Sequence, residues 1–116
     1  VNWLVKNGRA NKIHLLLGFS AGGNVVNMTK KLAGLKPLTL ACTRQTTNPF
    51  VQTVQPETIG IQFANHNTAI QNFNNPKQAL FWAKKQLGPK DLLLITGSMF
   101  LAGELRPYFK AKKVQD

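Results

Sequence analysis

The sequence predicts a single α/β domain in which helices cover both faces of a mostly parallel sheet. Two short apolar runs, Ile13 to Gly18 and Leu92 to Thr96, have the length and the glycine or polar boundaries of fully buried parallel strands. Each run is followed by a turn and a helical pattern, and strands that alternate with helices indicate βαβ units. The chain has 116 residues, of which 43% are hydrophobic, so one domain with one core is expected.

The remaining elements follow from apolar spacing and from capping residues. Helices are predicted at Asn24 to Leu32, Asn75 to Leu87 and Met99 to Leu105, a third strand at Leu38 to Thr43, a short helix from Pro56 to Phe63 and a small strand at Thr68 to Ile70. The helix that follows Asn75 has a clear start, because an asparagine cap precedes Pro76 at the first helical position. Pro107 disturbs the last helix, since proline cannot donate an amide hydrogen.

The beginning of the chain is typical of the end of a helix. Trp3, Leu4, Val5 and Lys6 precede Gly8, and glycine is the usual residue just past a last helical turn. We therefore expect the chain to open inside a helix and to be part of a longer protein.

Composition excludes several classes of protein. Charged residues make up only 16% of the chain, which argues against intrinsic disorder. The longest apolar runs are far short of the ~20 residues that a membrane-spanning helix needs. Cys42 is the only cysteine, which excludes a disulfide scaffold and favours a reducing compartment. We expect a cytoplasmic protein with no membrane partner.

The charge balance allows two interpretations. The 15 Lys and Arg residues against 4 acidic residues give a net charge of +11, which suits a nucleic-acid-binding module. The basic residues are, however, spread along the chain as singles and pairs such as Lys84-Lys85, without interleaved exposed aromatic residues. We expect a solvated basic surface that attracts acidic substrates, with nucleic-acid binding as an alternative.

Two loops are candidates for a ligand site, because open parallel sheets bind ligands at the carboxyl ends of their strands. The first, Gly18 to Gly23, contains Ser20 and Gly22 and leads into Asn24, which can cap the next helix. The second is Gly97-Ser98. Both precede a helix N-terminus, where free backbone amides favour an anion.

The residues at this edge that could bind an anionic ligand are Ser98, Gly97 and Arg44. The Ser98 hydroxyl and amide would suit a carboxylate, although the serine could equally act only as an N-cap. Gly97 would permit close approach of a ligand to the backbone. Arg44 follows the third strand and could bind an anion, although a loop arginine is usually only solvated.

The first loop also contains the motif G-x-S-x-G, which is typical of the nucleophile elbow of α/β hydrolases. An α/β-hydrolase fragment with Ser20 as nucleophile is therefore an alternative function. It would need an acid and then a histidine on later loops, yet His66 is the only histidine after Ser20 and Glu57 the nearest preceding acid. Asp91 precedes its strand, at the wrong end of the sheet.

Other site motifs are not supported. The first loop lacks the Gly-Lys-Ser/Thr of a phosphate-binding P-loop and does not fit G-x-G-x-x-G. No metal site is expected: His14 lies in an apolar strand and Cys42 in another, and both are interpreted as core residues. Glu104 is expected to be solvated or ion-paired rather than catalytic.

The segment from Asp91 to Arg106, DLLLITGSMFLAGELR, resembles the C-terminal signature of the folylpolyglutamate synthase and dihydrofolate synthase family. That family shows an acid, a buried strand ending in Thr-Gly-Ser, and an aromatic-containing helix with Gly-Glu. The helix predicted at Asn75 to Leu87 and the strand, glycine loop and helix at Lys12 to Met28 are similar to the preceding family segments. The resemblance spans nearly the whole chain, and the Thr-Gly-Ser stretch is its specific part.

This resemblance implies the Rossmann-like C-terminal domain of a Mur-ligase-type enzyme, with residues 1–116 forming one three-layer domain. Such enzymes use ATP and Mg²⁺ to convert a pterin-linked carboxylate into an acyl phosphate that glutamate attacks. Their P-loop and magnesium ligands lie in an N-terminal ATPase domain, which would be the partner of this one. The family's first strand, with its Asp-x-Ala-His-Asn motif, has no counterpart here, so the chain alone should be inactive.

The resemblance also implies site residues. Gly97 and Ser98 would contact substrate, glutamate being the expected ligand beside a folate or dihydropteroate. Ser20, Gly22, Gly23, Asn24 and Arg44 are the possible loop residues of the cleft. Gly23-Asn24 stands where the family usually has Lys-Asp, which puts a charge role at that position in doubt.

Overall fold

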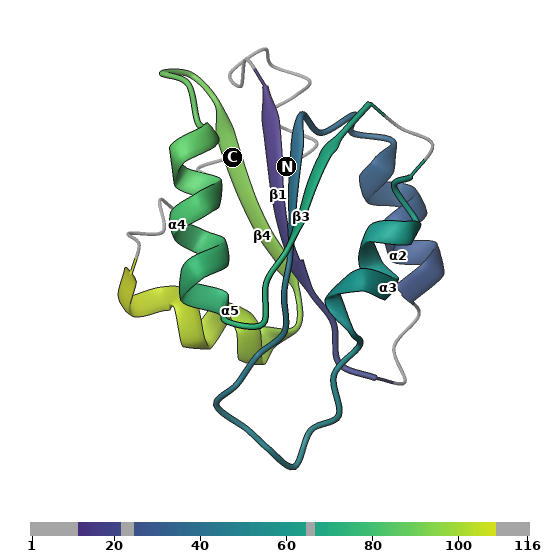
Figure 1. The fold of residues 1–116 in the computed structure, drawn as a ribbon, viewed down its shortest axis with the longest axis vertical. Helices are drawn as coiled ribbons and strands as arrows, with labels where there is room; N and C mark the ends of the chain where they lie inside the picture. Colours follow the sequence, from purple (N-terminus) through teal and green to yellow (C-terminus); the bar gives the residue numbers. More distant parts are fainter. Residues whose placement is uncertain (1–11, 22–24, 65–66, 109–116) are drawn as a thin grey trace, which may run out of the picture.

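The computed structural model describes residues 12–21, 25–64 and 67–108, which form a parallel sheet with helices on both faces (Figure 1). The strands are β1 (Ile13–Gly18), β2 (Thr39–Cys42), β3 (Ala69–Asn72) and β4 (Leu92–Gly97). Their order in the sheet is β3-β2-β1-β4, and every neighbouring pair is parallel. The predicted α/β fold class is therefore confirmed.

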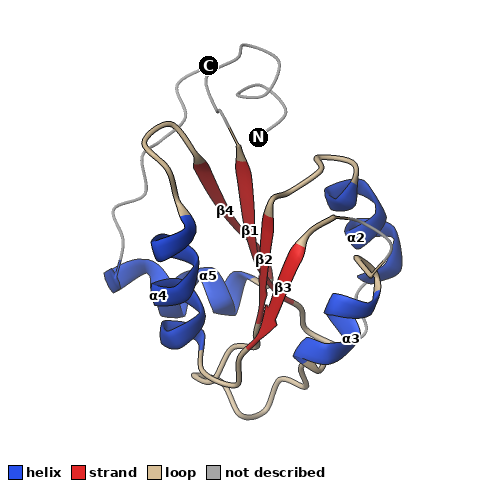
Figure 2. Ribbon diagram, turned by 45° about the horizontal axis from the view of Figure 1, so that its top comes forward, coloured by secondary structure: helices blue, strands red, loops and turns tan. Residues whose placement is uncertain are grey.

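The helices form two outer layers (Figure 2). The bounds are α2 (Val25–Ala33), α3 (Pro56–Ile61), α4 (Pro76–Gln86) and α5 (Met99–Leu105), followed by the 3-10 helix η1 (Arg106–Tyr108). Helices α2 and α3 cover one face of the sheet, and α4 and α5 cover the other. No described helix combines the length and the apolar character that crossing a membrane requires.

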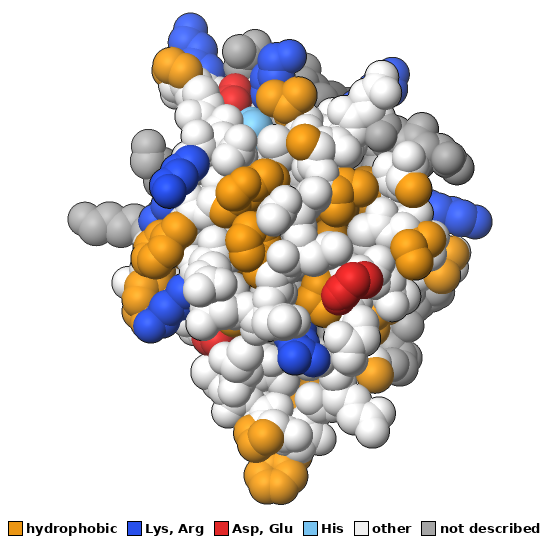
Figure 3. All heavy atoms as spheres, in the orientation of Figure 1, with side chains coloured by type: hydrophobic (Ala, Val, Ile, Leu, Met, Phe, Trp, Pro, Cys, Tyr) orange, Lys and Arg blue, Asp and Glu red, His pale blue; other side chains and the backbone are white. Residues whose placement is uncertain are grey.

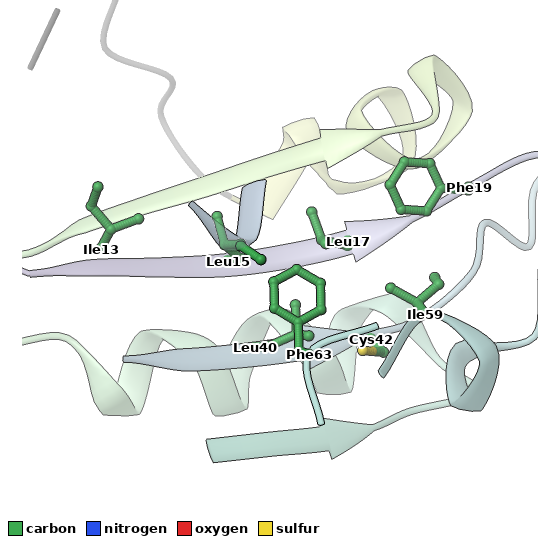
Figure 4. Close-up of a cluster of buried hydrophobic side chains, with 9 residues drawn as sticks. Ile13, Leu15, Leu17, Phe19, Leu40, Cys42, Ile59 and Phe63 are labelled. Carbon is green, nitrogen blue, oxygen red and sulfur yellow. The ribbon is translucent and has the colours of Figure 1, made fainter. Parts of the chain in front are cut away.

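Side chains along β1 point alternately to the two faces of the sheet, so the core has two parts. Ile13, Leu15 and Leu17 point toward α2 and α3, where they pack with Ile59 and Phe63 (Figure 4). Leu16 points the other way, toward buried alanines and leucines of α4 and α5. Every residue of β1 is buried, as a central strand covered on both faces requires.

The predicted elements are all present, with differences at their ends. Strand β1 has the predicted bounds, whereas β3 begins and ends later than the predicted Thr68 to Ile70. Helix α3 ends at Ile61 rather than at Phe63, because the chain leaves the helix in a turn. The interpretation of Trp3 to Lys6 as a helix end concerns residues outside the described ranges.

The strand pair β1 and β4 ends in a close backbone approach. Gly18 pairs with Gly97, which has φ +115°. A Cβ added to Gly97 would lie 2.3 Å from the Gly18 carbonyl oxygen, and one added to Gly18 would lie 2.9 Å from a methyl carbon of Leu101. Glycine at position 97 thus permits the close approach to the Gly18 backbone, and glycine at position 18 leaves room for Leu101 of α5.

Candidate functional site at the carboxyl edge of the sheet

The loops after β1 and β4 meet at the carboxyl edge of the sheet. Ser20 Oγ lies 3.3 Å from Ser98 Oγ, although the two residues are 78 positions apart. Ser98 is also the N-cap of α5, because its hydroxyl oxygen accepts a hydrogen bond from the amide of Phe100. The capping role that the sequence allowed for Ser98 is thus confirmed. Ser98 is only 7% exposed, so Ser20 is the more accessible of the two serines.

The segment that carries Ser20 is held by the long connection between β2 and α3. Ser20 forms an antiparallel bridge with Thr53, and the amide of Ala21 donates to the Gln52 carbonyl at 2.8 Å. The amide of Val54 donates to the Phe19 carbonyl at 2.9 Å. The position of the Ser20 hydroxyl is therefore set by backbone pairing on both sides of the residue.

This geometry does not support the nucleophile elbow. Ser20 continues in an extended bridge and has no positive φ, whereas an elbow serine stands on a sharp, strained turn. Of the histidines, His14 is fully buried and bonded elsewhere, and His66 lies outside the described ranges. The described residues bring no histidine to the Ser20 hydroxyl.

Thr43 and Arg44 directly follow β2 and therefore lie at the same edge of the sheet. The Thr43 amide donates to the Leu17 carbonyl at 2.8 Å, and Thr43 is 0% exposed. Within the described part of the chain, Thr43 Oγ1 is a buried polar atom without a hydrogen-bond partner. Arg44 is partly buried, and no described carboxylate forms an ion pair with it. The end of β2 thus has unused hydrogen-bonding capacity and a positive charge.

Two side-chain contacts organise the loop beyond Arg44. Gln45 is buried and closes a tight turn, because its amide nitrogen donates to the Asn48 carbonyl and its oxygen accepts from the Asn48 amide, each at 2.8 Å. Glu104 of α5 accepts from the backbone amide of Thr46 at 2.6 Å and from its hydroxyl. Glu104 is therefore hydrogen-bonded, with no ion pair to another described residue, and it ties the loop to α5.

The other predicted site residues divide into two groups. Gly22, Gly23 and Asn24 lie outside the described residues. Gly97 is at the edge, where its positive φ and the Gly18 carbonyl both require a glycine. Contact of Gly97, Ser98 or Arg44 with a ligand stays a prediction.

The amino edge of the sheet holds a different polar cluster. His14 Nε2 donates to Asp91 Oδ2 at 2.8 Å, and His14 Nδ1 lies 2.7 Å from the Thr39 hydroxyl. The Gly88 amide also donates to Asp91 Oδ2 at 2.8 Å. The bond from Gly88 and the bond from His14 lower the pKa of Asp91. His14 is thus a satisfied core residue, as predicted, although its bonding to Asp91 could not be inferred from sequence.

No metal centre is formed by the residues that the structure describes. They contain no group of three His, Cys, Asp or Glu side chains placed to hold an ion. Cys42 belongs to the apolar core, as predicted, and its burial, with a smaller effect of Glu57, raises the pKa of the thiol to about 12. The thiol is therefore protonated and inert at neutral pH.

The fold and this edge define a parallel α/β domain whose polar loops gather where such sheets bind ligands. Two solved structures share the fold, both of bifunctional folylpolyglutamate synthase/dihydrofolate synthase from Yersinia pestis, one complexed with AMPPNP and Mn ion. Their TM-scores are 0.74 and 0.73, with 12% and 10% sequence identity. The match covers 92% of this chain and 24% of each neighbour, so the chain spans about a quarter of their length. No family model and no curated protein matches the sequence.

Proposed function

We propose that this chain is the C-terminal domain of an ATP-dependent ligase that adds L-glutamate to dihydropteroate or to folates. The observation that carries the proposal is the fold likeness over 92% of the chain to a folylpolyglutamate synthase/dihydrofolate synthase. The Thr-Gly-Ser segment supports it independently, because the residues that resemble the family's signature form the end of β4 and the cap of α5.

The serine pair gives the carboxyl edge a donor for a carboxylate. Only one of the two hydroxyl hydrogens can lie between Ser20 Oγ and Ser98 Oγ, so the other is free to be donated to a ligand. Arg44 offers a guanidinium that can form paired hydrogen bonds with a carboxylate or a phosphate. A glutamate carboxylate could then contact Ser20 and Arg44, with Ser98 behind Ser20 as the residue that positions its hydroxyl.

ATP and Mg²⁺ would be held mainly by an N-terminal ATPase domain of the same enzyme. The described residues offer no magnesium ligand cluster, and we assign no catalytic step to them. In the complete enzyme ATP would supply the activation of the folate carboxylate. The role of this domain would be to close over that site, completing the glutamate and nucleotide sites and excluding water.

Glutamate binding tests the site directly. Titration of L-glutamate into the ¹⁵N-labelled chain is expected to shift the amide resonances of Ser20, Arg44 and Ser98, and to leave those of Lys30 and Lys31 on α2 unchanged. Ser20→Ala and Arg44→Gln should each weaken binding by about tenfold, which is the effect of one lost hydrogen bond to a charged group. Shifts spread over the whole chain would contradict the site.

Activity tests the role of the domain. The purified chain should neither hydrolyse ATP nor ligate glutamate, because the proposed phosphate and magnesium site belongs to another domain. A chimera in which this chain replaces the structurally matched quarter of the Yersinia pestis enzyme should retain ligase activity, and Ser20→Ala in the chimera should raise the KM for glutamate. Turnover by the isolated chain would refute the accessory role.

A further inference from the structure

The outer face of α4 combines lysines with an exposed aromatic ring. Ala79, Leu80 and Ala83 point into the core, so Lys77, Phe81, Lys84 and Lys85 share the opposite side of the helix. Phe81 is 53% exposed, although an apolar ring of this size is normally buried. We call the surface formed by Lys77, Phe81, Lys84, Lys85 and the adjoining Tyr108 the α4 basic face.

Tyr108 of η1 arranges two of these lysines without neutralising them. Lys77 Nζ lies 4.7 Å from the centroid of the Tyr108 ring, and Lys84 Nζ donates to the Tyr108 carbonyl at 2.7 Å. A ring face and a carbonyl orient an ammonium group but carry no net negative charge. In Figure 3, Lys or Arg side chains flank hydrophobic side chains along the side of the molecule where α4 lies.

The acidic residues that the structure describes are all placed elsewhere. Asp91 is bonded to His14 at the amino edge, and Glu104 is bonded to Thr46. Glu57 is on α3, which covers the other face of the sheet. The positive charge of the α4 basic face is therefore not compensated by any described carboxylate, and an anionic partner would complement it.

We propose that the α4 basic face binds single-stranded nucleic acid, with Phe81 as a stacking platform for a base and Lys77, Lys84 and Lys85 as phosphate contacts. The three lysines span about 12 Å along the helix, at 1.5 Å per residue, with Phe81 between them. Alternating cations and an exposed ring are what sequence-tolerant single-strand binding uses. The expectation that no exposed aromatic residue interleaves with the basic residues is wrong at this position.

The shape of the face favours nucleic acid over other anions. Phe81 and the lysines lie on the outer side of a helix, where a flexible strand can stack a base on the exposed ring, whereas an apolar peptide side chain would need a groove to bind. A single ring among three charged lysines is also too small an apolar surface for insertion into a membrane. The site is formed by α4 and η1, whereas the serine pair belongs to the loops after β1 and β4, and the proposal does not depend on the proposed ligase function.

Fluorescence anisotropy with labelled oligo(dT) tests the proposal. Phe81→Ala should weaken binding by about tenfold, which is typical of one lost base stack. Phe50→Ala is the matched control, because Phe50 is 94% exposed in the loop after β2 and has no part in the α4 basic face. It should change the affinity less than twofold.

Charge is tested with two lysine pairs in equivalent places. Lys84 and Lys85 lie in the last turn of α4, and Lys30 and Lys31 lie in the last turn of α2 on the opposite side of the sheet. K84Q/K85Q should lower the slope of log K against log salt concentration by about 1.4, at ~0.7 per phosphate contact, whereas K30Q/K31Q should leave it nearly unchanged. Circular dichroism verifies that each variant is folded.

Several outcomes would overturn the proposal. Equal weakening by the two lysine pairs would mean that binding reflects only the net charge. Loss of affinity in Phe50→Ala equal to that in Phe81→Ala would exclude a stack on α4. Competition by poly-L-glutamate or by phosphatidylserine vesicles as strong, per unit charge, as that by unlabelled oligo(dT) would assign the face to other anions.

Discussion

Both edges of the sheet carry buried polar side chains, but the two edges differ in how fully these side chains are hydrogen-bonded. At the amino edge, His14, Thr39 and Asp91 form a closed cluster in which each ring nitrogen of His14 has a partner. At the carboxyl edge, Thr43 Oγ1 has no partner among the described residues, and Ser20 and Ser98 share a contact of 3.3 Å. The amino edge is thus complete within the chain, whereas the carboxyl edge has hydrogen-bonding capacity left over.

This difference distinguishes polar residues that stabilise the fold from polar residues that are available to bind a ligand. A buried polar group that is fully bonded contributes to the fold, and a buried group left unpaired costs free energy unless something else satisfies it. In a parallel sheet the unpaired groups are expected at the carboxyl edge, since ligands bind there. Substitutions at the two edges should therefore affect the free energy of unfolding in different ways.

The largest effect is expected at the glycine pair of the carboxyl edge. Gly97→Ala should lower the free energy of unfolding by more than about 3 kcal/mol, because the new Cβ meets the Gly18 carbonyl and the positive φ disfavours alanine. Urea denaturation measures it. Gly103→Ala in α5 is the control: apart from its chain neighbours and its own helix backbone, no described atom lies within 4 Å of its Cβ position, so the helix should gain about 0.5–1 kcal/mol. Equal effects of the two substitutions would contradict the close approach.

Strands β1 and β3 show which parts of the fold could be predicted from the sequence. The bounds of β1 were predictable because a central strand buried on both faces is a continuous apolar run ending at a glycine. Strand β3 was predicted less well, because it is a sheet-edge strand whose Gln71 and Asn72 are exposed and polar, so it has no apolar pattern. Its position depends on backbone pairing with β2, which local sequence does not encode.

The candidate site was predictable only to the level of whole loops. The rule about carboxyl ends brings Ser20 and Ser98 to one edge, and the structure places their hydroxyls in contact. The bonds of His14 to Asp91 and of Thr46 to Glu104 join residues 77 and 58 positions apart, and they depend on strand register and helix packing. The exposure of Phe81 was likewise missed, since an apolar residue in an amphipathic helix is expected to face the core.

The next contrast compares two threonines at opposite ends of β2, Thr39 at its first position and Thr43 directly after its last. Thr39→Val should lower the free energy of unfolding by about 1–2 kcal/mol, because it leaves His14 Nδ1 buried without a partner. Thr43→Val removes a hydroxyl that has no partner among the described residues and should be neutral or stabilising by up to about 1 kcal/mol. Thermal and urea denaturation of both variants measure the contrast. Equal destabilisation would mean that Thr43 Oγ1 is satisfied in solution.

A smaller contrast lies within the serine pair. Ser98→Ala should cost about 1 kcal/mol, because it removes the N-cap of α5. Ser20→Ala should cost less than about 0.5 kcal/mol, because the one contact of its hydroxyl with a described residue is the long one to Ser98, and Ser20 is partly exposed. Urea denaturation of the two variants separates a residue that stabilises the fold from one that is available to a ligand. A larger cost at Ser20 than at Ser98 would reverse these assignments.

The last contrast appears only in acid and tests whether the amino edge is as complete as its geometry indicates. The bonds from Gly88 and His14 hold the pKa of Asp91 below its ordinary value of 3.8, so the folded state binds fewer protons than the unfolded state as the pH falls. The stabilisation from Asp91 is fully present above pH 3.8 and is lost as the pH drops through the lower folded-state pKa. Asp91→Asn should therefore make the free energy of unfolding, measured from pH 6 to pH 2 by urea denaturation, fall less steeply than in the wild type. Ser20→Ala removes neither a titratable group nor a bond to Asp91, so it should leave the wild-type slope unchanged. An identical slope in Asp91→Asn would show that the closed cluster does not couple folding to this proton.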